Sequence, residues 1–300
     1  MRSTVAVTLR VLIVGDVIDD VLVRPHGPTR PDTDTPADIA RRPGGSGANQ
    51  AAWLAEAGLA TRFAGRVGAA DVARHTAELS LVGVEAVLAG DGERPTGTIV
   101  VLVGTDGTRT MLTDRGANLG LTSSDLDDAL LDDVAHLHLS GYALFEPGVR
   151  AAVLDLIARA GDRGLGWSVD PSSTGFLADV GTRAFLDWVA GATLLLPNLE
   201  EGRLLTGLDD PDAIALALTS HAPLVALKLG GQGAIVARRD GGTTRVPTPA
   251  VDVVDPTGAG DAFAAGFLAA WLRSGDPLLA ARSGVALGAR ACATLGARPR

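Results

Sequence analysis

The sequence predicts an α/β protein with a mainly parallel central sheet that helices cover on both faces. Apolar runs bounded by turn residues alternate with segments of helical periodicity through most of the 300 residues. The expected strands are apolar on both faces, which is typical of parallel strands buried between two helical layers. No internal repeat or low-complexity linker interrupts the alternation, so we expect one domain over residues 1–300.

The expected elements alternate along the chain. In order, we expect a strand at 11–14, a helix at 50–59, a strand at 62–66, a helix at 70–81, a strand at 136–140, a helix at 149–160 and a strand at 165–170. Further strands are expected at 194–197, 224–229 and 234–238, then a helix at 261–271 and one or two helices at 278–295.

Two segments break this alternation and must pack away from the main sheet. Residues 21–43 are rich in Pro, Asp and Thr and have no helical period. Residues 96–102 and 108–113 are rich in β-branched residues and flank an Asp-Gly turn, Gly104-Thr105-Asp106-Gly107, which predicts a hairpin.

Composition limits the possible partners and surroundings. The net charge of −9 argues against nucleic acid or an anionic membrane as a partner. No apolar run is long enough to span a bilayer. Cys292 is the only cysteine, so an intramolecular disulfide is impossible and a cytoplasmic location is expected.

The most informative segment is Asp255-Pro256-Thr257-Gly258-Ala259-Gly260-Asp261, which leads into an expected helix. Glycines before a helix let backbone N–H groups converge, and a helix N-terminus attracts an anion. Asp261 lies at the mouth of such a site, where an acid can cap the helix or accept a proton beside a developing negative charge. Amides for the charge and a base for the proton are what phosphoryl transfer to an alcohol needs.

A second glycine-rich segment, Gly44-Gly45-Ser46-Gly47-Ala48-Asn49, opens the first expected helix. Its backbone can approach a ligand closely, and Asn49 offers a donor and an acceptor to a hydroxyl group. No Gly-x-Gly-x-x-Gly is completed, which excludes a dinucleotide fingerprint. Asp20, in the acidic segment after the first strand, can accept hydrogen bonds from sugar hydroxyls.

Two later motifs have more than one interpretation. Asn198 and Glu201 are three residues apart and share a helical face, so they can hold Mg²⁺ through water or form a helix cap. Lys228 ends a strand that resembles the lysine strand of protein kinases, but no His-Arg-Asp or Asp-Phe-Gly follows. The glycines after it, Gly230 and Gly233, lack the order of a Walker loop and fit either a nucleotide turn or a plain hairpin.

In this order, the motifs resemble those of the ribokinase-like (PfkB) family of carbohydrate and nucleoside kinases. The resemblance implies a three-layer α/β/α sandwich with a small β lid built from segments of about 21–43 and 96–115. It implies ATP and Mg²⁺ as cofactors, and transfer of the γ-phosphate to a hydroxymethyl group of a small sugar or sugar derivative. Because exposed lid strands often pair between subunits, we also expect a homodimer.

The resemblance also assigns roles to individual residues. The catalytic set is Asp261 as base with Gly258, Ala259 and Gly260 as the anion site, and the substrate set is Asp20, Gly45, Ser46 and Asn49. The nucleotide set is Asn198, Lys228, Gly230 and Gly233. The metal set is Asn198 and Glu201 for Mg²⁺, and Asp255 and Thr257, with backbone near Gly296, for a monovalent cation such as K⁺.

The substrate stays open at this stage. Ile18 stands where the ribokinase pattern has Asn, Ser46 replaces Lys, and Ser140 falls near the place of Glu, which makes ribose doubtful. Ile18 suits an apolar ring, so a nucleoside kinase is an alternative, and Arg115 leaves room for a sugar acid. A catalytically silent sugar-binding protein is a third possibility. His136 and His138 alternate on one strand, and we expect them to be half-buried rather than metal ligands.

Overall fold

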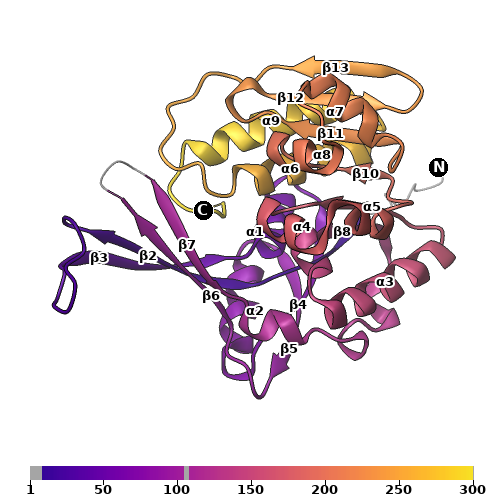
Figure 1. Cartoon of the computed structure of the whole chain (residues 1–300). Coiled ribbons are helices and arrows are strands. Elements are labelled where there is room, and N and C mark those ends of the chain that lie inside the picture. Colours follow the sequence, from indigo (N-terminus) through magenta and orange to yellow (C-terminus); the bar gives the residue numbers. More distant parts are fainter. Residues whose placement is uncertain (1–8, 105–107, 300) are drawn as a thin grey trace, which may run out of the picture.

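The computed structural model describes residues 9–104 and 108–299, and within them the chain forms two sheets (Figure 1). The larger sheet has the strand order β13-β12-β11-β10-β9-β8-β1-β4-β5. Neighbouring strands run parallel from β5 to β11, and β12 and β13 are antiparallel additions at one edge. The strands are β1 (Arg10–Val14), β4 (Ala60–Gly68), β5 (Val84–Asp91), β8 (Val134–Ser140), β9 (Gly166–Asp170), β10 (Leu194–Leu195), β11 (Leu224–Lys228), β12 (Ala234–Arg238) and β13 (Gly242–Val246).

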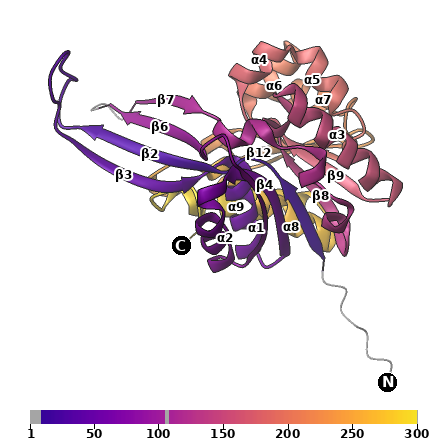
Figure 2. The ribbon, with the colours of Figure 1, turned by 90° about the horizontal axis from the view of Figure 1, so that it is seen from below.

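Helices cover both faces of this sheet, which confirms the predicted α/β/α sandwich. One layer holds α1 (Ser46–Glu56), α2 (Val72–Leu81), α8 (Ala259–Ser274) and α9 (Pro277–Cys292). The opposite layer holds α3 (Pro147–Asp162), α4 (Thr174–Val180), α5 (Thr182–Trp188), α6 (Leu199–Thr206) and α7 (Pro211–Leu218). Figure 2 shows the two groups on opposite sides of the strands.

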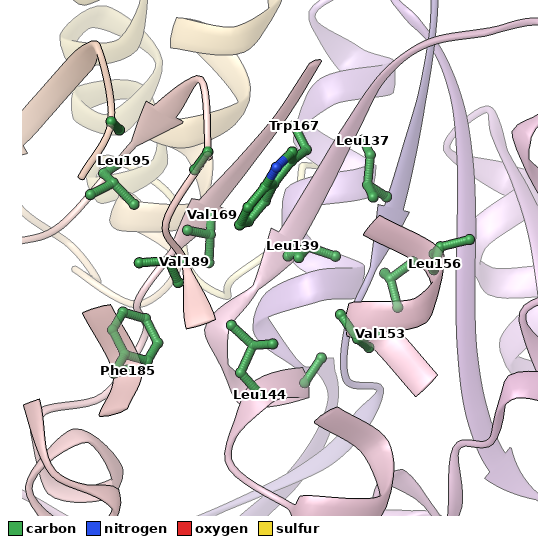
Figure 3. Packing of buried hydrophobic residues seen from close by; sticks show 14 of the residues in the cluster. Leu137, Leu139, Leu144, Val153, Leu156, Trp167, Val169, Phe185, Val189 and Leu195 are labelled. Atoms are coloured by element: carbon green, nitrogen blue, oxygen red, sulfur yellow. The ribbon is translucent and has the colours of Figure 1, made fainter. Parts of the chain in front are cut away.

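Burial on both faces explains why the central strands are apolar throughout. In β1, Val11 and Ile13 belong to the core against α1 and α8, whereas Leu12 and Val14 belong to the core against α3. Figure 3 shows the second core, in which side chains of β8 and β9 meet those of α3 and α5. At about 25 cal/mol per Å² of apolar surface buried, these two cores are the main source of stability.

A smaller sheet with the order β3-β2-β6-β7 projects from one side of the sandwich (Figures 1 and 2). We call it the small sheet. Its strands are β2 (Ile18–Pro25), β3 (Ala37–Gly44), β6 (Gly97–Val103) and β7 (Arg109–Asp114). The antiparallel pairing of β6 with β7 agrees with the predicted hairpin, whose Asp-Gly turn at 106–107 lies outside the described residues. The segment 21–43, which has no periodicity, supplies two paired strands.

The small sheet joins the main sheet at the carboxyl end of β1. β2 follows β1 after a short turn, and β3 leads directly into α1, so the small sheet is continuous with the loops at the carboxyl end of β1. No helix among the described residues is long and apolar enough to cross a membrane.

Candidate active site

One cavity gathers residues from the small sheet, the β1–β2 turn, the start of α1 and the start of α8. Asp20, Gly45, Ser46, Asn49, Gly258 and Asp261, all predicted from the sequence, line it together with Asp255 and Thr257. Its remaining walls come from the small sheet, from the segment after α9, and from Tyr142 after β8 and Phe176 of α4. Parallel-sheet proteins bind ligands beyond the carboxyl ends of the strands, and this cavity lies there.

Asp261 lies in the first turn of α8 and is partly buried. It does not cap the helix, because Gly258 is the N-cap residue and no side chain caps it. Instead, Ser46 Oγ donates to Asp261 Oδ1 at 2.7 Å and Asn49 Nδ2 donates to Oδ2 at 3.1 Å. Burial raises the pKa of the Asp261 carboxyl to about 7, although these two donors oppose the shift.

The N-terminus of α8 is formed by a left-handed glycine. Gly258 has φ 77°, and a Cβ there would lie 2.4 Å from the backbone oxygen of Ala297. The first turn of α8 therefore begins beside Asp261, with the positive end of the helix dipole there, and the Ala259 N–H donates to the Pro256 carbonyl at 3.3 Å. This geometry suits a group that carries negative charge.

A different acid, Asp16, anchors the backbone at the start of α1. Asp16 accepts hydrogen bonds from the backbone N–H of Ser46 at 3.2 Å and of Gly47 at 3.1 Å, so it takes the anchoring role at this helix start. Asp20, four residues later, is partly buried near Gly44, and burial raises the pKa of its carboxyl to about 6. Asp20, near the start of β2, therefore faces the cavity and, among the described residues, anchors no backbone.

A buried polar chain behind Asp261 was not predicted from the sequence. Gln50 Nε2 lies 3.2 Å from Ser46 Oγ and 3.4 Å from Asp170 Oδ2, and Lys228 Nζ donates to the same Asp170 oxygen at 2.6 Å. Burial alone would lower the pKa of Lys228, but the charges of Asp170 and Glu201 outweigh it and raise that pKa. The ammonium is thus held charged close to the start of α8.

The two strand histidines extend this chain and correct one prediction. His136 and His138 are 2% and 0% exposed rather than half-buried, because β8 is covered on both faces. Ser168 Oγ lies 2.8 Å from His136 Nε2 and 2.7 Å from His138 Nδ1, and His138 Nε2 lies 3.2 Å from Gln50 Oε1. Burial lowers the pKa of both rings, to about 4 and about 3, so they are neutral at pH 7.

The segment after α9 also reaches the site; the family resemblance predicts backbone near Gly296 there, but not the contacts of Ala297 and Arg298. Arg298 Nε donates to Asn49 Oδ1 at 3.0 Å and its Nη2 donates to the Gly44 carbonyl at 2.7 Å. Trp53 Nε1 donates to the Ala297 carbonyl at 2.8 Å. These contacts orient the Asn49 amide so that its Nδ2 points at Asp261.

The acid proposed for a monovalent cation has a guanidinium beside it. Arg109, from β7 of the small sheet, donates to Asp255 Oδ1 at 2.8 Å and also contacts Thr257 Oγ1. Gly296 N donates to Asp255 Oδ2 at 3.1 Å. Burial opposes the shift, but the donors from Thr257, Arg109 and Gly296 lower the pKa of Asp255 to about 2.

Asn198 and Glu201 form a reciprocal cap at the start of α6. Glu201 N donates to Asn198 Oδ1 at 2.9 Å, and Asn198 N donates to Glu201 Oε2 at 2.9 Å. Burial raises the pKa of Glu201 to about 7, against the charge of Lys228. Both residues line an open cleft with Lys228 and Gly230. Gly233 instead lies against the backbone of Val246, because a Cβ at Gly233 would lie 2.0 Å from the Val246 carbonyl oxygen.

A carboxylate, a helix N-terminus and a partly buried lysine lie close together here, and comparison with known proteins identifies the family. The sequence pattern of the pfkB family carbohydrate kinases matches residues 8–299. The chain belongs to the pfkB family of carbohydrate kinases. An ATP-dependent ribose-1-phosphate kinase of Halopiger xanaduensis is 34% identical to this pfkB-family kinase over 300 residues, which cover 97% of this chain and 94% of that protein.

Solved structures agree with the fold of this pfkB-family kinase. A probable sugar kinase of Rhizobium etli is 25% identical, with a TM-score of 0.86 over 97% of this chain and 95% of that one. A putative ribokinase II of E. coli, solved with ATP and Mg²⁺, is 22% identical, with a TM-score of 0.85 over 96% and 94% of the two chains. These matches confirm three predictions from the sequence: the family, the fold class and the activity of an ATP-dependent carbohydrate kinase.

Proposed function

We propose that this pfkB-family kinase transfers the γ-phosphate of ATP to a hydroxymethyl group of a small sugar derivative, with Asp261 as general base. The observation that carries the proposal is the Asp261 carboxylate, whose pKa of about 7 suits proton transfer at neutral pH. It lines the cavity beside the N-terminus of α8. Both halves of phosphoryl transfer to an alcohol therefore have a candidate group.

Ser46 and Asn49 orient this base, and the start of α8 stabilises the transferred group. Each of the two side chains donates to one Asp261 oxygen, which leaves the remaining lone pairs to accept the substrate proton. The amides of Gly258, Ala259 and Gly260 would bind the negative charge that develops on the phosphoryl oxygens, and Ala259 would exchange its 3.3 Å bond to the Pro256 carbonyl for that contact. A Cβ at Gly260 would lie 3.7 Å from Lys228 Nζ, so the ammonium adds a positive charge at the same place.

The nucleotide would lie along the open cleft between α6 and the turn after β11. The oxygen atoms of Asn198 and Glu201 would contact Mg²⁺ through water while the phosphates supply most of its ligands. The described residues contain no group of three or more His, Cys, Asp or Glu that could hold a metal ion on their own. When bound, Mg²⁺ would neutralise phosphate charge. Gly230 leaves room for phosphate or ribose, since nothing lies within 4 Å of a Cβ there.

The acceptor is proposed from the cavity and from the relatives. The relative from Halopiger is named for ribose 1-phosphate, and the whole family is named for carbohydrates. Asp20, on β2 of the small sheet, offers a carboxylate to sugar hydroxyls beside the apolar side chain of Ile99, its partner in β6. An ADP-release assay with pentoses, pentose phosphates and nucleosides tests the proposal. Release with nucleosides alone would identify a nucleoside kinase, and release with no acceptor despite tight sugar binding would identify a silent binding protein.

The pH dependence of the rate provides a specific test. Because burial raises the pKa of Asp261 to about 7, the base is ionised above that pH and protonated below it. We expect kcat/KM to fall roughly tenfold per pH unit below 7 and to level off above it, measured from about pH 5.5 to 8.5. Asp20→Asn should keep this acid limb, whereas the residual rate of Asp261→Asn should lack it. A flat wild-type profile would contradict the assignment.

We also propose that a monovalent cation such as K⁺ binds at Asp255 and Thr257. Because Arg109 already donates to both side chains, K⁺ must compete with its guanidinium. Arg109→Ala should therefore raise the ratio of the rate in K⁺ to the rate in tetramethylammonium several-fold. Arg245→Ala, which removes an arginine paired with Asp212 outside the cavity lining, is the control. Equal rates in the two cations for wild type and Arg109→Ala would exclude the cation site.

Finally, we propose that the small sheet acts as a lid and that its outer strand edges pair two subunits in the cytoplasm. Ile39 and Leu112 of the small sheet are exposed apolar residues outside the cavity lining, which a partner sheet would cover. A monomeric elution profile at working concentration would contradict the dimer.

A further inference from the structure

Of the arginines that line the cavity, Arg115 is the partly buried one, and it forms no ion pair with the residues that the structure describes. Arg115 directly follows β7 and lines the cavity. Its polar contact among the described residues is a hydrogen bond from Nη2 to the Tyr142 carbonyl at 3.3 Å, and its buried Nε has no partner there. Arg109, on the same wall, is by contrast paired with Asp255. A partly buried charge without a counter-charge is costly unless a ligand supplies one.

Arg115 is held in place before any ligand arrives. Its guanidinium carbon lies 4.7 Å from the Tyr142 ring centroid and 5.7 Å from that of Phe176, and these two rings meet edge to face at 5.8 Å. Below it, Asn118 Nδ2 donates to the Arg115 carbonyl and to the Val17 carbonyl, both at 2.9 Å. The residue is thus fixed to the turn between β1 and β2, just before the strand that carries Asp20. A stacked, planar donor of this kind suits bidentate contact with an oxyanion.

We propose that the acceptor sugar carries an anionic group, a phosphate ester or a carboxylate, that binds Arg115 while the hydroxymethyl group faces Asp261. This deepens the proposed function and rests on it. The chain has a net charge of −9, and Asp16, Asp20 and Asp261 also line the cavity, so an anion enters against the general field. A local fixed cation is needed to hold it. Arg42, an exposed residue of the rim, adds a second positive charge to the lining.

The test compares matched acceptors and two matched variants. Ribose, ribose 1-phosphate and ribonate each present a hydroxymethyl group, but only the last two are anionic, and they distinguish a phosphate ester from a carboxylate. Arg115→Gln removes the charge. Arg150→Gln is the control, because Arg150 also stacks on an aromatic ring, 3.9 Å from the Trp188 centroid, and donates to the Leu144 carbonyl, yet it does not line the cavity.

We expect wild type and Arg150→Gln to prefer at least one anionic sugar over ribose in kcat/KM by roughly 10- to 100-fold, the usual effect of one charged contact. Arg115→Gln should lose most of this preference with little change toward ribose. Equal kcat/KM for ribose and both anions in wild type, or an unchanged preference in Arg115→Gln, would overturn the inference.

A failure of the proposed function would look different, because no acceptor would then release ADP. In that case calorimetry without nucleotide still decides the inference. Tighter binding of ribose 1-phosphate or ribonate than of ribose, lost in Arg115→Gln and kept in Arg150→Gln, supports it. Equal affinities for the three sugars contradict it.

Discussion

Replacing Asp261 by asparagine should lower kcat by roughly 10²- to 10⁴-fold, the range for loss of a general base. Asparagine keeps the size of the side chain, but its single amide oxygen can accept only one of the two hydrogen bonds that Ser46 and Asn49 donate to Asp261, and it cannot take the proton of the attacking hydroxyl. Initial rates of ADP release under saturating substrate measure the effect. KM should change much less than kcat, because the base acts on the transition state.

Thermal unfolding separates this loss from damage to the fold. A carboxyl whose pKa rises from 3.8 to about 7 on folding stabilises the folded state when protonated, and this contribution is lost as pH rises through 7. Above pH 7 the wild-type carboxyl is ionised, and keeping its charge buried costs free energy of folding. The neutral amide of Asp261→Asn avoids this cost, so its melting temperature should not fall below that of wild type. An intact fold with undiminished turnover would show that Asp261 is not the base.

Replacing Gly258 by alanine should lower kcat by roughly 10²-fold or more, because the amides at the start of α8 would move. The left-handed backbone at φ 77° costs an alanine about 1–2 kcal/mol. In addition, its Cβ would lie 2.4 Å from the Ala297 oxygen, and backbone on both sides leaves little room to relax. The melting temperature should therefore fall together with the rate.

The other end of the same helix provides the control. Gly275, the C-cap of α8, has φ 69° and ψ 2°, close to the φ 77° and ψ 1° of Gly258. No atom lies within 4 Å of a Cβ at Gly275. Gly275→Ala therefore carries the same backbone cost without the clash, and its kcat should match wild type. If both variants lose stability equally and both keep full kcat, the packing of Gly258 against Ala297 does not support the anion site.

The parallel core was predictable because its strands are apolar on both faces. The strand predicted at 234–238 has the bounds of β12, and the one at 136–140 lies within β8. The missed elements carry weaker signals. β5 alternates buried and exposed side chains at the sheet edge, and α4 and α5 have seven residues each, too few for a clear period. β2 and β3 pair along a segment whose composition favours turns.

The residues of the site also fall into two groups, those that the sequence could locate and those that only the structure reveals. Asp261, Gly258 and Asn49 lie in compact motifs whose residues act together, so the sequence alone could locate them. Gln50 and Asp170 join the site through a hydrogen bond across 120 positions, and Arg298 reaches Asn49 across 249. No local pattern marks such residues, because a buried amide or carboxylate is chosen by what the fold brings beside it. The Mg²⁺ role of Asn198 and Glu201 stays a prediction, because the cap that these residues form at the start of α6 also explains their spacing.

The contacts of residues 296–298 have a practical consequence for experiments. These residues touch Asp255, Trp53, Asn49 and the backbone at Gly258, so they form part of the wall around the reacting groups. Trimming them for crystallisation, or attaching a purification tag directly after them, would alter the catalyst itself. Affinity handles belong at the opposite end of the polypeptide, ahead of β1, where Arg10 already lies at the start of an ordered strand.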